Sequence, residues 1–236
     1  MQFEINSILY FRSIKSNSML QPATLKFLEG LKLNNNKPWF EGHKDAYEAA
    51  KLDFEKLISE VLTGLASIEP GFKEQKAKDC VFRIYRDVRF AKDKTPYKPN
   101  FGAYMSRGGK KFNGAGYYLH LEPGGSFAAG GLWMPEANIL KAVRQEIDYN
   151  FGEFEKIVRN KKFEKIFGVL QGEKLKSAPK DYAADNPAIE YLKMKSFTVM
   201  HKIDDEILTG KPLVKTCMDV YKTMQPMIDF LNRSLD

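Results

Sequence analysis

The stretch FGAYMSRGGKKFNGAGYYLHLEPGGSFAAGGLW, residues 101–133, decides the fold class. Short runs rich in apolar residues are separated here by glycine-rich turns, SRGGKKFNGAG and EPGG. Runs of this length between tight turns are typical of antiparallel strands, so the stretch predicts a meander sheet. The predicted strands are 80–90, 101–106, 116–122 and 126–133, with one further short strand, FTVMHKI, at 197–203.

Helical patterns flank the predicted sheet on both sides. Upstream, Pro22 begins a short helix that Gly30 ends, and Asn36 caps a second helix with Pro38 in its first turn. That second helix has one apolar stripe and is expected to run for about seven or eight turns against the core. The stripe consists of Phe54, Leu57, Ile58, Val61, Leu62 and Leu65.

After Pro135 the pattern becomes helical again, with predicted helices at 136–149, 151–168 and 212–234. Helices on each side of a sheet segment, without alternating strand and helix units, favour the α+β class. We therefore expect a central antiparallel meander sheet flanked by N-terminal and C-terminal helices. Residues 19–236 are expected to form one domain, with Met19 as the original start and residues 1–18 as an extension.

The composition narrows the class of protein. The chain has 236 residues, 43% of them hydrophobic, which is enough for a substantial core. No apolar run approaches the roughly 20 residues that a membrane helix needs, so we expect a soluble protein without a membrane partner. Cys80 and Cys217 lie far apart and form no Cys-x-x-Cys pattern. Two reduced thiols of this kind favour the cytoplasm.

The positive charge is concentrated in one segment. Nine basic and two acidic residues lie between Arg83 and Lys111, so this segment alone accounts for the net charge of +7. A local positive field of this kind raises the expectation of an anionic partner. The alternative is that these lysines and arginines are simply solvated.

The segment FRIYRDVRF, residues 82–90, carries three arginines on the first predicted strand. With a period of two, Arg86 shares a face with four apolar residues, whereas Arg83 and Arg89 lie on the opposite face. A guanidinium among apolar neighbours needs a carboxylate, carbonyl groups or a ligand anion. A pair between Asp87 and Arg89 is the simpler alternative for the other face. The turn-rich segment that follows adds the candidate binding residues Lys92, Lys94 and Lys98.

The strand GYYLHLE, residues 116–122, adds a titratable group to the predicted sheet. Tyr118, His120 and Glu122 share one face because they are spaced by two residues. His120 and Glu122 are therefore candidates for general acid and base catalysis, with Tyr118 as a neighbouring binding residue. They can equally form a surface pair. The glycines of GGSFAAGG, residues 124–131, suit tight strand packing or the close approach of a ligand.

Several chemistries lack their motifs. The three histidines are dispersed and show no metal-ligand spacing, so no metal site is predicted. There is no phosphate-loop, dinucleotide-binding or serine-hydrolase motif, and no cofactor can be assigned.

Four stretches of the chain together resemble a known family. The core RDVRFAKDKTPYK at 86–98, the upstream NNNKPWFEGHKDAYE and the downstream GYYLHLEPGGSFAAGGLWMPE and DYAADNPAIEYLKMKSF are similar to the DUF2461 family of bacterial and fungal proteins. The resemblance covers about residues 20–233. It implies a domain of unknown function and brings no reaction, cofactor or catalytic residue with it.

Three hypotheses for function follow from the residues. The first is a site on the sheet for a phosphate- or carboxylate-bearing small molecule, and enzymatic activity is left open. The second is a structural role, in which the arginines pair with internal carboxylates and the protein acts by interaction only. The third is nucleic-acid binding, with aromatic stacking platforms beside the basic segment. The first hypothesis uses Arg83, Arg86, Arg89, Lys92, Lys94, Lys98, Tyr118, His120 and Glu122, and the third uses Tyr85, Tyr97, Phe101, Tyr104 and Phe112. The oligomeric state is not predicted.

Overall fold

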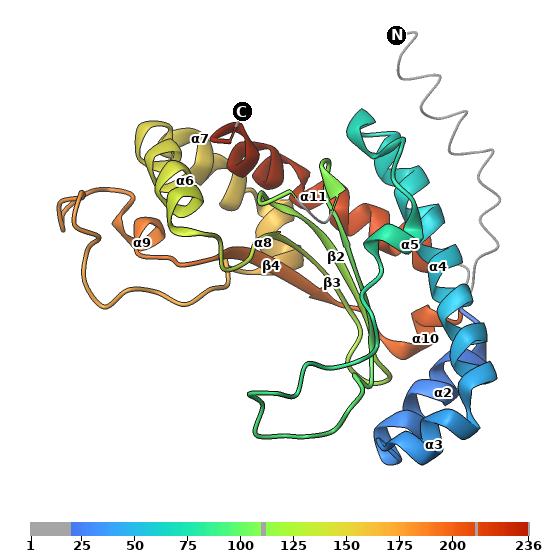
Figure 1. The fold of residues 1–236 in the computed structure, drawn as a ribbon. Helices are drawn as coiled ribbons and strands as arrows, with labels where there is room; N and C mark the ends of the chain where they lie inside the picture. The colour runs from blue at the N-terminus through green and yellow to red at the C-terminus, as the bar shows by residue number, and fades with distance from the viewer. Residues whose placement is uncertain (1–19, 110–111, 211, 236) are drawn as a thin grey trace, which may run out of the picture.

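The computed structural model describes residues 20–109, 112–210 and 212–235, so the expected extension at 1–18 lies outside the described residues. Its centre is an antiparallel sheet in which each strand pairs with the next in sequence order, which confirms the meander and the α+β class (Figure 1). The strands are β1 (Phe101–Met105), β2 (Gly116–Leu121), β3 (Phe127–Leu132) and β4 (Phe197–Lys202).

Helices precede β1, connect β3 to β4, and follow β4. Before the sheet come α2 (Pro22–Leu33), α3 (Lys37–Gly42), α4 (Lys44–Ala66), the short 3-10 helix η1 (Pro70–Phe72) and α5 (Ala77–Cys80). Between β3 and β4 lie α6 (Ala137–Tyr149), α7 (Phe151–Val158), α8 (Lys161–Phe167) and α9 (Ile189–Leu192). After β4 come α10 (Asp205–Leu208) and α11 (Leu213–Arg233). No helix in the described ranges is long and apolar enough to cross a membrane.

Some helix boundaries differ from the predictions. The first helix continues past Gly30 to Leu33. The predicted cap is confirmed, because the Asn36 side chain accepts the Trp39 N–H at 3.0 Å, but the chain breaks at His43 into α3 and a helix of about six turns, α4. The predicted helix at 151–168 is two helices, because Asn160 begins α8 with a side-chain cap on the Lys162 N–H.

The predicted strand at 80–90 is wrong. After α5 the chain makes only isolated bridges, from Val81 to Ala103 and from Tyr85 to Tyr97. Phe82 and Phe90, expected on a core face, are 41% and 95% exposed. The chain that returns past Tyr85 toward β1 contains Pro96 and Pro99, whose missing N–H groups prevent a continuous ladder.

One face of the sheet is covered by helices. α11 packs on β3 and α4 packs on β1, and together they bury alternate strand residues. Gly130 permits this closeness, because a Cβ atom there would lie 2.3 Å from Met224 Sδ. The buried Asn232 side chain ties the end of α11 to the sheet by accepting the Ala115 N–H and donating to the Ala115 carbonyl. The buried strand residues on this covered face include Phe101, Ala103, Met105, Tyr117, Leu119, Leu121, Ala128, Phe197 and Val199.

The other face of the sheet, here called the open face, carries the alternate residues. The register places His120 opposite Gly102 and Phe127, and Ala129 opposite Tyr118 and Met200. In Figure 1 two long loops border this face, the segment between α5 and β1 and the orange segment between α8 and β4. The open-face residues are Gly102, Tyr104, Gly116, Tyr118, His120, Phe127, Ala129, Gly131, Thr198, Met200 and Lys202.

Candidate functional site: a groove on the open sheet face

A groove of about 680 Å³ lies on the open face. Its size is in the range of sites for small organic ligands. Strands β2, β3 and β4 form its floor, the chain after α5 contributes Phe82, and the turn after β3 contributes Trp133 and Met134. The groove is therefore built largely by the meander itself, on the face opposite α4 and α11.

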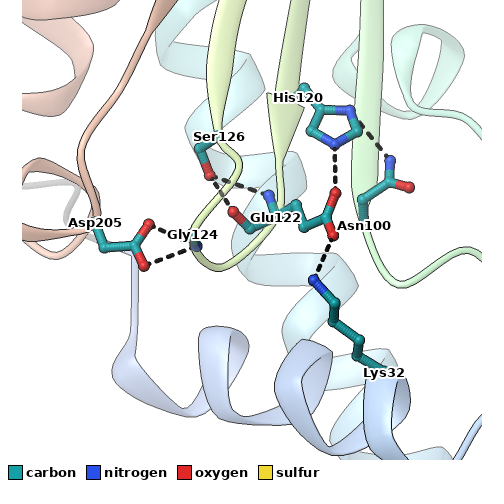
Figure 2. A network of polar contacts seen from close by, with 7 residues as sticks. All are labelled: Lys32, Asn100, His120, Glu122, Gly124, Ser126 and Asp205. Atoms are coloured by element: carbon teal, nitrogen blue, oxygen red, sulfur yellow. Dashed lines mark hydrogen bonds and ion pairs between the residues drawn. The ribbon is translucent and has the colours of Figure 1, made fainter.

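A chain of polar contacts lies on the open face and ends at the groove. Tyr118, which lines the groove, has its hydroxyl 3.1 Å from His120 Nδ1, and His120 Nε2 lies 3.2 Å from Glu122 Oε2. The other carboxylate oxygen of Glu122 accepts a bond from Lys32 Nζ at 3.0 Å. Asn100 Nδ2 lies 3.4 Å from His120 Nδ1 (Figure 2). The predicted association of Tyr118, His120 and Glu122 on one face is thus present.

The surrounding structure restrains both Glu122 and His120. The Glu122 backbone N–H donates to Ser126 Oγ, and Ser126 donates back to the Glu122 carbonyl. The following turn is held by Asp205 of α10, whose carboxylate accepts the Gly124 N–H (Figure 2). The His120 ring stacks on Phe127 with centroids 4.6 Å apart. The surrounding protein therefore restrains both side chains.

These contacts set the direction of the hydrogen bonds from Tyr118 through His120 to Glu122. A carboxylate can only accept, so His120 Nε2 carries the proton that it donates to Glu122. His120 Nδ1 then has a lone pair facing the Tyr118 hydroxyl, which donates to it. A nucleophile or acid within reach of a base, with that base oriented by a third group, is the geometry used by activated nucleophiles and proton relays.

The electrostatic surroundings favour the same assignment. Burial alone would raise the pKa of Glu122, but the hydrogen bonds from Lys32 and His120 outweigh it and hold this pKa below its usual value. Burial raises the pKa of Tyr118, so its hydroxyl stays protonated at neutral pH. A neutral Tyr118 and an ionised Glu122 therefore lie on either side of the His120 ring.

A positive site lies beside the same groove. Lys98 Nζ lies 5.6 Å from the centre of the Phe82 ring, and Phe82 in turn contacts the Tyr118 ring. Burial and then repulsion from Arg83 lower the pKa of Lys98. Among the described residues no carboxylate pairs with Lys98. Two like charges close together, one of them half-buried, form a site that an external anion would stabilise.

The other predicted basic residues lie farther along the same loop. Arg86 donates hydrogen bonds to Asp93 and to Thr95. Arg89 forms a bidentate ion pair with Asp87, in which Nη2 and Nε lie 2.7 and 3.0 Å from the two carboxylate oxygens. Lys94 donates to the Val88 carbonyl. Lys92 is exposed. Apart from Lys92, these side chains bond within the loop, and none of the four lines the groove.

The aromatic residues of the nucleic-acid hypothesis are scattered. Phe101 and Tyr97 are 2% and 3% exposed and cannot stack on bases. Tyr85 is about half exposed on the loop, whereas Tyr104 and Phe112 line the groove. A continuous stacking surface along the basic segment does not form.

Several residues of the site were not identified from the sequence. Lys32 reaches Glu122 from α2, a separation of 90 residues that no local pattern could indicate. Asn100 precedes β1 and has no motif. Trp133 and Met134 carried a usable signal, because Trp133 ends the predicted strand at 126–133 and a second large apolar residue follows it. They are 71% and 73% exposed, and Met134 has a left-handed backbone with φ of 42°.

Metal binding has no support in the described ranges, where no group of three or more His, Cys, Asp or Glu residues could hold an ion. The candidate site consists of the groove, the hydrogen-bonded side chains of Tyr118, His120 and Glu122, and the neighbouring Lys98.

The fold and site define an α+β protein with an open-faced meander sheet. The chain matches the family described as "Conserved hypothetical protein (DUF2461)" over residues 23–230, and it belongs to that family. No curated protein and no solved structure matches it.

Proposed function

We propose that the groove on the open face binds a small molecule that carries a carboxylate or phosphate, and that Tyr118, His120 and Glu122 accept a proton from it. The observation that carries this proposal is the half-buried Lys98, which lies beside Arg83 without a carboxylate among the described residues and next to a groove-lining ring. Such an ammonium gains a partner when an anionic ligand binds.

The proposed chemistry is a proton transfer through the relay. An acidic O–H or N–H of the ligand gives its proton to Tyr118 Oη, while the tyrosine proton moves to His120 Nδ1. The resulting imidazolium is neutralised by Glu122, which Lys32 and Ser126 hold in place. Removing the proton leaves a nucleophilic oxygen or nitrogen on the ligand beside the cationic pair.

The basic loop supports the second hypothesis for its own part of the chain. Arg86 and Arg89 are matched by Asp93 and Asp87, which is the behaviour expected of an internal ion-pair network. We therefore assign anion binding to Lys98 and Arg83, and a loop-stabilising role to Arg86, Arg89 and Lys94. Both cysteines are buried thiols, which suits the reducing cytoplasm that we propose as its location.

The test is a thermal-shift screen of small carboxylates and phosphates on three proteins. Lys98→Met removes the charge and keeps an unbranched side chain of similar length, whereas Arg89→Ala removes a charge outside the groove. We expect at least one anion to stabilise the wild type and Arg89→Ala equally, and to lose its effect on Lys98→Met. Equal loss in both variants, or no stabilising anion at all, would contradict the anion site.

A second measurement tests the relay separately from binding. Tyr118→Phe keeps the ring and removes the hydroxyl, and Glu122→Gln keeps the shape and removes the charge. Both should still bind the anion found in the screen. When the ligand carries an acidic O–H, binding should place its proton on His120 in the wild type and in neither variant, as reported by the nitrogen-15 signals of the His120 ring. The same protonation of His120 in both bound variants would rule out the relay.

A further inference from the structure

The floor of the groove is made of residues with almost no side chain. Gly116 lies opposite Gly131 in the register of β2 and β3, and Ala129 lies between Tyr118 and Met200. All of these line the groove. The Tyr104 ring covers Gly116, because a Cβ atom there would lie 2.8 Å from that ring. The low part of the floor is therefore at Ala129 and Gly131, where a strand residue would usually project a larger side chain.

Aromatic rings surround this floor. Tyr118 and Phe127 rise from the strands with ring centroids 5.9 Å apart, and Phe82 contacts Tyr118 from the chain after α5. Trp133 stands at the opposite end of β3 from Phe127. The rings that line the groove are Phe82, Tyr104, Phe112, Tyr118, Phe127 and Trp133.

The turn after β3 holds Trp133 and Met134 in solvent at the rim. Met134 is the one non-glycine residue in the described ranges with a positive φ, and its N–H donates to Oγ of the buried Ser196 at 2.9 Å. A strained backbone that presents two large apolar side chains to water at the edge of a groove indicates a ligand contact.

We infer that the occupant of the groove is a planar aromatic ring system bearing one carboxylate or phosphate. The ring would lie on the glycine and alanine floor, with Tyr118, Phe127 and Trp133 at its edges and faces, and its anion would face Lys98 and Arg83. This inference rests on the proposed anion site and adds the shape of the ligand. Aromatic side chains prefer other rings in offset or edge-to-face arrangements, which an alkyl chain does not offer.

Three matched probes separate the ring from the charge by isothermal titration. 2-Naphthoate has both features, octanoate has the carboxylate without the ring, and 2-naphthamide has the ring without the charge. 2-Naphthyl phosphate tests the second anion. We expect 2-naphthoate or the phosphate to bind about tenfold or more tightly than octanoate and 2-naphthamide.

Each other result has a distinct meaning. If octanoate binds as tightly as 2-naphthoate, the aromatic inference is wrong and the anion site remains. If 2-naphthamide binds as tightly as 2-naphthoate, the anion site is wrong and the aromatic groove remains. If neither aromatic anion binds at millimolar concentration, the inference is overturned.

A substitution in the floor places the ring on this surface. Ala129→Leu should fill the floor and weaken 2-naphthoate binding about tenfold or more, whereas Ala129→Ser keeps the residue small and should bind like the wild type. Trp133→Ala, at an exposed position, should weaken the aromatic probes and leave octanoate unchanged. Circular dichroism and urea unfolding identify any variant that fails to fold. Normal binding by a folded Ala129→Leu protein would show that the ring does not lie on this floor.

Discussion

The two faces of the sheet use the same strands in opposite ways. On the covered face, alternate positions carry Phe101, Tyr117 and Leu119, which are sealed by α4 and α11. On the open face, the positions between them carry glycine, alanine and the polar chain from Tyr118 to Glu122. The covered face therefore holds the packed core of the fold, and the open face is where we propose that a ligand binds.

The largest difference in the free energy of unfolding should come from replacing one phenylalanine on each side of the sheet by alanine. Phe101→Ala removes a ring that is 2% exposed and stacks on Phe54, and should cost about 3–5 kcal/mol in the free energy of unfolding. Phe82→Ala removes a groove ring that is 41% exposed and should cost less than about 1 kcal/mol. Urea unfolding measures both. Equal losses would show that the two faces do not differ in this way.

Smaller changes in the free energy of unfolding, opposite in sign, are expected when the carboxylates of Glu69 and Glu122 are each replaced by an amide. Glu69 is one of the two carboxylates. Burial raises its pKa, and repulsion from Asp229 raises it further. Its buried Oε2 atom has no hydrogen-bond partner among the described residues. Ionised Glu69 therefore opposes folding at pH 7. Glu69→Gln should raise stability there by about 1 kcal/mol or less, after allowance for solvent screening. The gain should vanish below the unfolded pKa of about 4.3.

Glu122 on the open face should behave in the reverse way. Its folded pKa is lowered, so ionised Glu122 contributes stability above the unfolded pKa of about 4.3, and that contribution is lost as pH falls through the lower folded pKa. Glu122→Gln should therefore destabilise the protein modestly at pH 7, and the difference from the wild type should shrink toward pH 3. Unfolding curves at several pH values test both variants, and the same sign for both would contradict the contrast.

The smallest effect is expected on the loop between α5 and β1. Arg89 is 76% exposed in its pair with Asp87, and exposed pairs of this kind add little to stability. Arg89→Ala should leave the melting temperature and anion binding unchanged, whereas Lys98→Met should lose anion binding alone. A clear fall in stability for Arg89→Ala would show that the loop pairs support the fold.

The sequence predicted the elements that depend on local pattern. Turns and period-two runs identified β1 to β4, and the apolar stripe of α4 is buried as expected, because these signals arise from neighbouring residues. The same alternation led to the wrong prediction of a strand at 80–90. A strand also needs a partner, and the chain that returns there carries Pro96 and Pro99.

The candidate site was predictable only where it lies within one strand. Tyr118, His120 and Glu122 are spaced by two residues, so their common face could be read from the sequence. The roles of Lys32 and of the arginines could not be predicted from the sequence. Lys32 reaches the relay through the packing of α2, and the arginines find acids inside their own loop only once that loop folds.

The most direct test of the central claim uses the two tryptophans as reporters. Trp133 lies on the groove rim, whereas Trp39 stacks on His43 in the N-terminal helices and does not line the groove. In a nitrogen-15 spectrum, titration with 2-naphthoate or 2-naphthyl phosphate should shift the indole signal of Trp133 and the ring signals of His120, and leave the Trp39 indole in place. If both indole signals stay fixed, or Trp39 alone shifts, the open face is not the binding site.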